Sequence, residues 1–232
     1  MITFNGASID SVAPVKIEDV RIGPIEIAPV VRPRAIDAGS EFVRVRGGIR
    51  TISVMFAILD DSKINRQAYL QAVTDWATTS EEKPLLVPWN QSRYLQCICT
   101  GKPEPSTRQW WESKLRLTFT CFSNPYWTDT AEKTVACGTA FTVGGSAVPL
   151  MRITRALNSS ASNQAYSDGT NTITFSTIPS GSLEIDLNRQ TAAVGGTSIM
   201  QYYAVASKWI LPKLGAQTIT GTGTVRYRER WE

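Results

Sequence analysis

Side chains capable of acid–base catalysis are scarce in this sequence. None of its 232 residues is histidine, so the commonest general base, the usual partner of a catalytic serine and the commonest transition-metal ligand are all absent. Acid–base chemistry would have to use carboxylates or lysines, and the best pair would come from Asp168, Glu184 and Asp186. An enzyme is therefore the least favoured class of function, and we predict no catalytic and no cofactor-binding residues.

Other acidic residues occur where structural roles account for them. Asp60-Asp61 and Glu81-Glu82 bracket a predicted helix, where capping and solvent exposure explain neighbouring carboxylates. Asp168-Gly169-Thr170-Asn171 has one certain carboxylate, which supplies too few oxygens for a calcium site and is typical of a turn. We therefore predict no metal-binding residues in these stretches.

The four cysteines are the remaining candidates for metal binding. Cys97, Cys99, Cys121 and Cys137 do not form the two Cys-x-x-Cys pairs of a zinc knuckle. Cys97 and Cys99 lie on one face of a predicted strand, and Cys121 ends the apolar face of another. We predict buried thiols that behave as small hydrophobic side chains, with a zinc site or a disulfide as the alternative.

Three glycine-rich stretches could in principle bind phosphate: Gly47-Gly48, Gly144-Gly145 and Gly221-Thr222-Gly223. None has the Lys-Ser or Lys-Thr of a phosphate-binding loop, and none opens a recognisable helix. Turns between strands are the better interpretation.

The basic residues do not indicate a nucleic-acid-binding surface. The formal net charge is +4, with 15 basic and 14 acidic residues up to residue 129 and 9 and 6 after it, whereas non-specific DNA binders concentrate many Lys and Arg on one face. Arg226, Arg228 and Arg230 do share one face of the last predicted strand. This row is either a solvated face or a stripe that binds phosphate or a protein, and we take it as the candidate partner face.

Aromatic residues offer one possibility for ligand binding, the stacking of sugar rings. The cores of β-sandwiches use the same residues, and consecutive tyrosines in a strand cannot face one side. A carbohydrate-binding module is therefore the alternative function. The residues concerned are Trp110, Trp111, Tyr126, Trp127, Tyr202, Tyr203 and Trp209.

The composition favours short strands and turns. The chain is 42% hydrophobic, with 16 glycines and 12 prolines, so we predict a mainly β protein, and two domains rather than one. No run approaches the roughly 18 apolar residues of a membrane span, and the N-terminus lacks the basic and apolar regions of a signal peptide. We therefore expect a protein made in the cytosol with no membrane insertion.

An extended arm or edge strand is predicted over residues 22–34. Its three prolines exclude a central strand or a helix, because proline has no N–H to donate. The arm carries Ile25, Ile27, Val30 and Val31, which must be buried against its own core or against a neighbouring subunit. We take these four as candidate subunit contacts.

A β-hairpin is predicted to follow the arm. Residues 41–46 alternate valines with Arg44 and Arg46, and residues 50–59 form the strongest strand pattern in the chain. Gly47-Gly48 lies between them as a turn signal, so we predict that the two strands pair across the glycines. Arg44 and Arg46 are further candidate subunit or partner contacts.

One amphipathic helix is predicted over about residues 62–79. Asp60-Asp61-Ser62 supplies side chains for its N-cap. Apolar side chains recur at helical spacing, so we expect the helix to pack on a sheet. These are Ile64, Tyr69, Val73, Trp76 and Ala77.

The strand at residues 115–121 leads to a predicted domain junction. Apolar and polar residues alternate along it, which is the period of a strand with one buried face. Asn124-Pro125 then turns the chain out of the sheet. Tyr126 and Trp127 follow at once, and we take them as the candidate interface between two domains.

We place the two domains at residues 1–127 and 128–232. In the second, turn signals recur roughly every 8 to 12 residues, which is typical of an antiparallel sandwich. Residues 158–171 are predicted to form a loop, and Gly195-Gly196 the turn of a hairpin. The predicted strands are residues 134–137, 139–143, 148–157, 172–178, 183–187, 205–210 and 224–231.

Taken in order, several motifs resemble the distal tail protein family of long-tailed bacteriophages. In the first half these are Met-x-x-Phe-Asn-Gly at residues 1–6, Ala38-Gly39-Ser40, Arg50-Thr51-Ile52-Ser53-Val54-Met55-Phe56, Asp75-Trp76 and Phe119-Thr120-Cys121-Phe122-Ser123-Asn124-Pro125-Tyr126. In the second half they are residues 183–191 with a following Gly-Gly turn, residues 209–219 and residues 225–231. The resemblance spans nearly the whole chain.

This resemblance implies two antiparallel β-sandwich-type domains, the first with one helix and an extended hairpin and the second galectin-like. It implies a structural virion protein, a homo-hexameric ring at the tail tip that is assembled in the host cytoplasm. The ring would join the tail-tube protein to the tail-associated hub or fibre protein, and DNA would pass through its lumen without specific binding. In that setting the alternative function is the recognition of glycans on the host surface.

Overall fold

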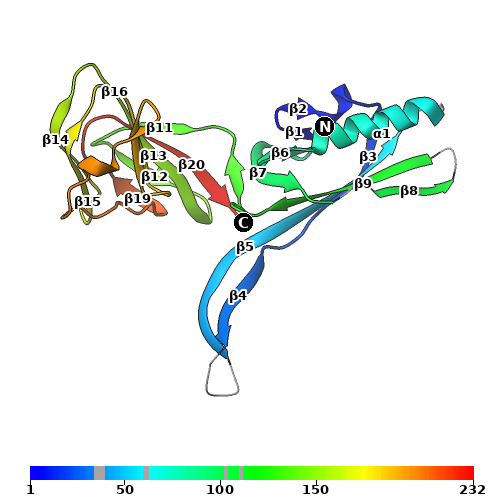
Figure 1. Ribbon diagram of the computed structural model, residues 1–232, viewed down its shortest axis with the longest axis horizontal. Helices are drawn as coiled ribbons and strands as arrows, with labels where there is room; N and C mark the ends of the chain where they lie inside the picture. Colours follow the sequence, from blue (N-terminus) through cyan, green and yellow to red (C-terminus); the bar gives the residue numbers. More distant parts are fainter. Residues whose placement is uncertain (34–39, 60–62, 102–103, 110–111) are drawn as a thin grey trace. The chain divides into compact units, whose positions relative to one another are not determined.

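The structure is a computed structural model that describes residues 1–33, 40–59, 63–101, 104–109 and 112–232. Within these ranges the backbone alone is described for residues 27–33, 40–47, 63–64, 66, 104–109 and 112–113. The chain divides into two compact units, Met1–Trp127 and Thr128–Glu232, shown in Figure 1. The mainly β fold class is confirmed, since strands make up most of both units.

The first unit contains a sheet built around one long strand, β5 (Ser40–Ile58). β5 pairs antiparallel with β3 (Val15–Ile22) on one edge and with β9 (Glu112–Cys121) on the other. The far edge of β9 pairs with β8 (Glu104–Gln109) and with the end of β7 (Asn90–Cys99). As the alternation predicts, β5 and β9 bury one face, formed by Ile52, Val54, Phe56, Leu115, Leu117, Phe119 and Cys121.

A second sheet of this unit has the order β2–β1–β6–β7. It contains β1 (Thr3–Phe4), β2 (Ala7–Ser8) and β6 (Lys83–Val87), and the short 3-10 helix η1 (Ile9–Ser11) follows β2. β7 pairs with β6 along its length and with β9 through Ile98 and Cys99. One strand therefore passes between the two sheets, and the apolar side chains of both form one core.

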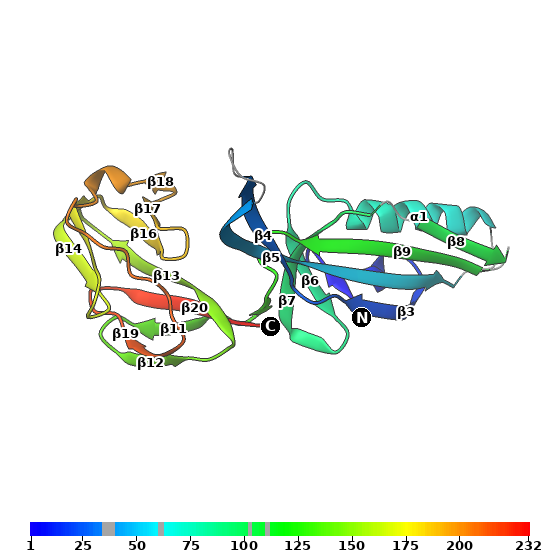
Figure 2. The same cartoon turned by 90° about the horizontal axis from the view of Figure 1, so that it is seen from below.

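Helix α1 (Lys63–Ala77) packs against this core, as Figure 2 shows beside β9. Val73 and Ala77 are buried, and the Trp76 ring lies 5.7 Å from Phe4 and 6.4 Å from Phe119 between ring centroids. The predicted apolar stripe is therefore the packed face of the helix. The side chain of Ile64 and the predicted N-cap at residues 60–62 lie outside the described residues.

The predicted hairpin across Gly47-Gly48 is wrong. β5 runs through both glycines without a turn, and its first half pairs with β4 (Glu26–Pro33) instead. The reason is a close approach of the neighbouring strand: a Cβ at Gly48 would lie 2.0 Å from the Ile25 side chain and 3.0 Å from the carbonyl oxygen of Glu26. Glycine in a strand often marks such an approach.

The second unit is organised by a sheet of order β18–β17–β16–β13–β20, with β10 and β11 also beside β20. Its strands are β10 (Trp127–Asp129), β11 (Lys133–Ala136), β13 (Ala147–Leu157), β16 (Gly181–Asp186), β17 (Thr191–Val194), β18 (Thr197–Ser198) and β20 (Thr224–Trp231). In this sheet β13 pairs antiparallel with β16 and with β20, and β16 pairs antiparallel with β17. Gly195 and Gly196 have φ of 56° and 83°, which confirms the turn predicted between β17 and β18.

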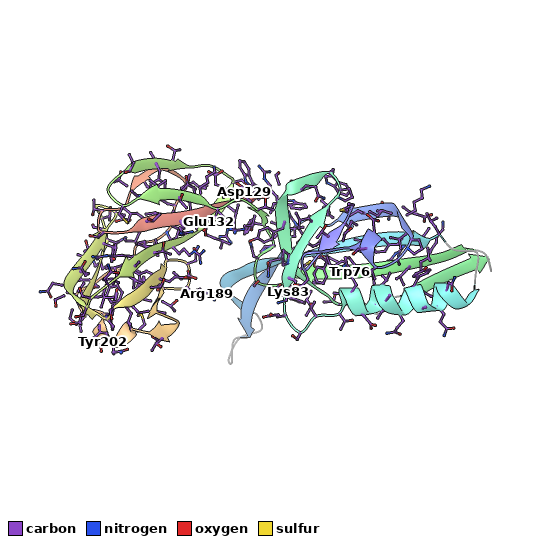
Figure 3. The ribbon with its side chains drawn as sticks, turned by 90° about the horizontal axis from the view of Figure 1, so that it is seen from above. Trp76, Lys83, Asp129, Glu132, Arg189 and Tyr202 are labelled. Atoms are coloured by element: carbon purple, nitrogen blue, oxygen red, sulfur yellow. The ribbon has the colours of Figure 1, made fainter. Side chains whose placement is uncertain are left out.

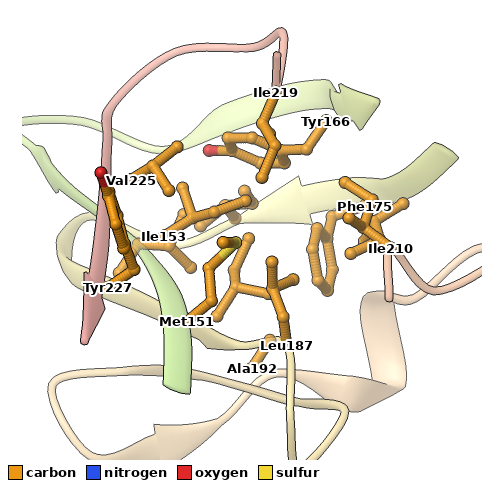
Figure 4. Close-up of a cluster of buried hydrophobic side chains, with 14 of the residues drawn as sticks. Met151, Ile153, Tyr166, Phe175, Leu187, Ala192, Ile210, Ile219, Val225 and Tyr227 are labelled. Carbon is orange, nitrogen blue, oxygen red and sulfur yellow. The ribbon is translucent and has the colours of Figure 1, made fainter. Parts of the chain in front are cut away.

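Two strand pairs face this sheet across the second core. They are β12 (Ala140–Val143) with β19 (Gly215–Thr218), and β14 (Ala161–Ser167) with β15 (Thr172–Ile178). The core side chains come from both layers and from the segment around Ile210, as Figure 4 shows. A 3-10 helix, η2 (Met200–Tyr202), closes the edge of the cluster.

Two predictions for the second unit are wrong. Half of the segment expected to be a loop, residues 158–171, forms β14, because its backbone pairs with β15 although its side chains are largely polar. Residues 205–210, expected to be a strand, are irregular. Their apolar side chains do not alternate between two faces as in a strand; Ile210 is buried in the second core and Val205 is fully exposed.

Candidate assembly surfaces

The arm of the first unit is a two-stranded ribbon made of β4 and the first half of β5. In register, Val30 lies opposite Arg44 and Ala28 lies opposite Arg46. Over this length β5 is the one strand that pairs with β4 in the described part of the chain, since β3 and β9 join β5 only from Arg50 onward. Among the described residues, both long edges of the ribbon therefore carry backbone N–H and C=O groups without a strand beside them (Figure 1).

Six residues assigned to subunit contacts from the sequence belong to this ribbon or its base. Ile25 is half-buried just before β4 and lies over Gly48. Ile27, Val30 and Val31 are in β4, and Arg44 and Arg46 are in β5. The side chains of these last five lie outside the described residues, so their role as contacts stays a prediction.

Two exposed apolar side chains on the first unit were not predicted as contacts from the sequence. Trp89 is 61% exposed in the turn between β6 and β7, and Met1 is 62% exposed. The Gln91 amide joins the two places, since it donates to the carbonyl oxygens of Met1 and Val87 at 3.2 and 2.5 Å. The sequence signal was Pro88-Trp89, an aromatic residue directly after a strand-ending proline.

Glu82 positions the chain where it leaves β9. Its Oε1 accepts hydrogen bonds from the backbone N–H groups of Phe122 and Ser123 at 2.5 and 3.1 Å, and its Oε2 accepts from the Ser123 hydroxyl. Glu81 instead forms an exposed ion pair with Lys83. The adjacent carboxylates therefore have different roles, and that of Glu82 depends on a strand about 40 residues away in sequence.

The candidate interface residues Tyr126 and Trp127 come shortly after the segment 122–123 that Glu82 holds. Asn124 is buried, and its side-chain oxygen accepts from the backbone N–H of Tyr126 at 3.3 Å. Trp127 is partly buried against the core of the first unit. Their role between the two units stays a prediction.

The arginine row of β20 faces away from the second core. Val225, Tyr227 and Glu229 alternate with it and are buried. Arg226 donates to Thr154 and Glu132, both at 3.1 Å, and Arg228 to the carbonyl oxygen of Asp129 at 3.4 Å. Arg230 donates to the carbonyl oxygen of Val148, so all three make contacts within their own unit.

Glu132 joins this row to the neighbouring strand. It accepts from Arg226 of β20 and from Arg152 of β13, the latter at 3.0 Å, and Figure 3 shows it beside β20. Burial alone would raise the pKa of Glu132, but the hydrogen bonds and charges of the two arginines outweigh burial and hold it below the ordinary value of 4.5. The row therefore stabilises the sheet, and a further role as a partner face stays a prediction.

The three carboxylates considered for catalysis make structural contacts. Asp168 accepts from the backbone N–H groups of Thr170 and Asn171 at 2.9 and 2.6 Å, which confirms the turn predicted there. Asp186 likewise accepts from two backbone groups that follow β16. Glu184 pairs with Arg152 at 3.4 Å, and it lines the same open depression as Asp186.

The aromatic rings considered for sugar stacking are mostly occupied by packing. Tyr203 stacks on Trp209 at 5.3 Å between ring centroids with an interplanar angle of 8°. Both, with Tyr202, are partly buried against the second core. Trp110 and Trp111 lie outside the described residues. A stacked sugar needs a free ring face, and Tyr203 and Trp209 each cover one face of the other.

All four cysteines are free thiols, with Cys97 and Cys121 buried and Cys99 and Cys137 half-buried. Among the residues that the structure describes, no three His, Cys, Asp or Glu side chains are grouped so as to hold a metal ion. Over the same residues, no helix has the length and apolar character needed to cross a membrane.

Comparison of the whole chain with solved structures identifies the fold. The chain is similar to the crystal structure of the Dit protein of phage SPP1, with a TM-score of 0.75, 16% sequence identity, and 100% of this chain and 98% of that chain covered. The chain has the fold of a phage distal tail protein. At this identity the likeness shows the fold alone.

The distal tail fold is also found, less closely, in the baseplate of phage P2 in its activated conformation with calcium. That match has a TM-score of 0.51 and 10% identity, and it covers 94% of this chain and 91% of that chain. The SPP1 protein is described as a paradigm of the hub of the adsorption apparatus in phages that infect Gram-positive bacteria. No protein-family model matches the sequence, and no curated protein is significantly similar to it.

Proposed function

We propose that this protein is a structural component of a phage virion that forms a hexameric distal tail ring. The ring joins the tail tube to the hub or fibre of the tail tip, is assembled in the host cytoplasm, and lets DNA pass through its lumen without specific binding. The observation that carries the proposal is the likeness to the SPP1 distal tail protein, which covers 100% of this chain.

The ribbon supports the part of the proposal that concerns assembly. The unpaired backbone groups along the two edges of the ribbon can form hydrogen bonds with a strand of another chain. We therefore expect these edges to be covered in the assembled protein. A neighbouring copy can cover both edges, and repetition of that contact around an axis closes a ring. Ile25, Ile27, Val30, Val31, Arg44 and Arg46 are the ring contacts that we assign.

The remaining surfaces are assigned to other proteins of the tail. On the first unit we assign the exposed Trp89, with Met1 close to it, to a partner protein, because a large aromatic side chain commonly anchors an interface. On the second unit, the Arg226, Arg228 and Arg230 row is the charged face that a partner could contact.

The test is the mass and shape of the purified protein, measured by size-exclusion chromatography with light scattering and by negative-stain microscopy. We expect a ring of six times the monomer mass of 25.5 kDa, either alone or after addition of the tail-tube protein. A protein that stays monomeric at high concentration in both samples would contradict the proposal.

A matched pair of variants tests the ribbon itself. Replacing residues 28–46 by a short Gly-Ser turn should abolish the ring, while the cooperative unfolding of the rest of the chain remains. Arg189→Ala alters a side chain that is 83% exposed on the second unit, and it should form rings like the parent protein. Rings formed by the shortened chain would show that the ribbon is not the assembly element.

A further inference from the structure

Two buried cysteines of the first unit face each other across the strand pair that connects its two sheets. β7 and β9 are antiparallel, with Ile98 opposite Thr120 and Cys99 opposite Phe119. Extending this register by one residue places Cys97 opposite Cys121. Both side chains are fully buried.

The hydrogen bonds between the strands show which kind of pair this is. The N–H of Thr100 donates to the carbonyl oxygen of Thr118 at 2.8 Å, so these two residues form a hydrogen-bonded pair. Such pairs alternate along an antiparallel ladder with non-hydrogen-bonded pairs, whose Cα atoms are closer, at about 4.5 Å. Counting back three positions makes Cys97 and Cys121 a non-hydrogen-bonded pair, within the roughly 4.4–6.8 Å that disulfides span.

The two thiols are in contact inside the core. Burial raises the pKa of the Cys97 thiol, and contact with the Cys121 thiol adds to the rise, so the Cys97 thiolate forms when this site opens to solvent and not in the closed core. Cys121 is the last residue of β9, and the next residue, Phe122, is 54% exposed. Fraying of this strand end would give a reagent access to Cys121 before Cys97.

We propose that Cys97 and Cys121 are a cross-linking site, which forms a disulfide between β7 and β9 when the protein meets a low-molecular-weight disulfide outside a reducing compartment. The Cys121 thiolate attacks the reagent and releases one thiolate, and the Cys97 thiolate then displaces the second reagent thiolate from Cys121. One protein S–S bond forms, the reagent S–S bond breaks, and the two protons end on the two reagent thiols. This inference does not depend on the proposed function.

The bond would reinforce a weak point of the first unit. β7 pairs with β9 at two residue pairs within the strands, and the Thr100 N–H adds a hydrogen bond just beyond them, although β7 carries the connection between the two sheets. A disulfide here closes a loop of about 25 residues and restricts the unfolded chain. We expect the unfolding midpoint of the first unit to rise by roughly 5–10 °C.

The full chain carrying Cys99→Ala and Cys137→Ala is the sharpest test, because it keeps only the two opposed thiols. After incubation with glutathione disulfide in mild denaturant and refolding, we expect no free thiol, the mass of a monomer less two hydrogens, and a raised midpoint that a reductant reverses. Two remaining thiols, a stable glutathione adduct, or chains joined to one another would each overturn the proposal.

The unsubstituted protein gives an independent readout if the double variant folds poorly. Oxidation should lower the number of free thiols from four to two, and peptide mapping should find Cys97 linked to Cys121. Cys121→Ala should then keep all three of its remaining thiols under the same conditions. A link through Cys99 or Cys137 instead would overturn the assignment.

Discussion

At the scale of single residues, Glu82 has the contact that most directly shapes the path of the chain. Its carboxylate accepts from Phe122 N–H, Ser123 N–H and the Ser123 hydroxyl. Glu82→Gln removes the charge that strengthens these bonds, and we expect a loss of about 1 kcal/mol in the free energy of unfolding of the first unit. Denaturant titration followed by tryptophan fluorescence measures it.

The neighbouring carboxylate is the control for that experiment. Glu81→Gln alters an exposed side chain whose ion pair is with Lys83, so the free energy of unfolding should change little. Equal effects of the two substitutions would show that the hydrogen bonds of Glu82 to residues 122–123 contribute nothing to the free energy of unfolding.

A second residue, Glu132, makes the stability of the second unit depend on pH. Its pKa lies below 4.5 in the folded protein, so its contribution is complete above the unfolded pKa and is lost as the pH falls through the folded pKa. We expect stability to decline below about pH 4.5, and Glu132→Gln to lower stability at neutral pH while flattening this decline. Urea titrations at several pH values test both parts.

The comparison for Glu132 is Glu184, which also pairs with Arg152 but is 49% exposed. Glu184→Gln leaves both bridges of Glu132 in place, so the acid dependence should persist. If Glu132→Gln kept the full acid decline, the arginine pair would not be its source.

At the scale of elements, the close packing of Gly48 decides how the ribbon joins its sheet. Gly48→Ala places a methyl group against the Ile25 side chain and near the carbonyl oxygen of Glu26. We expect a destabilisation of roughly 1–3 kcal/mol, the usual cost of overpacking. Thermal unfolding of the purified protein measures the loss.

A double variant separates the two contacts. Ile25→Ala removes the side chain that lies nearest, so Gly48→Ala combined with it should cost less than the sum of the single changes. Strict additivity would place the clash on the backbone of Glu26 rather than on Ile25.

At the scale of the whole molecule, the described residues form two hydrophobic cores that have no residue in common. We therefore propose that residues 1–127 and 128–232 are separate domains, and we expect each to fold when expressed alone. Calorimetry should give a midpoint for each fragment within a few degrees of one of two transitions of the full chain. Failure of the second fragment to fold would instead indicate that its stability depends on the first.

The sequence by itself determined which faces are buried. Alternation along residues 50–59 and 115–121, the helical spacing of Val73, Trp76 and Ala77, and the turns at Asp168 and Gly195-Gly196 were all predicted and are found. These signals are local, since they depend on residues within one element. The resemblance to distal tail proteins likewise extends to the fold.

Only the tertiary structure decided which segments pair. Gly47-Gly48 has the composition of a turn, yet β4 occupies the edge of β5, and Gly48 accommodates the close approach of Ile25 and Glu26. Residues 161–167 form a strand because β15 supplies their hydrogen bonds. Glu82 beside Ser123, and Glu132 between Arg152 and Arg226, depend on side chains brought together from distant parts of the chain. A linear pattern shows what an element can bury, whereas its neighbours follow from the packing of the whole chain.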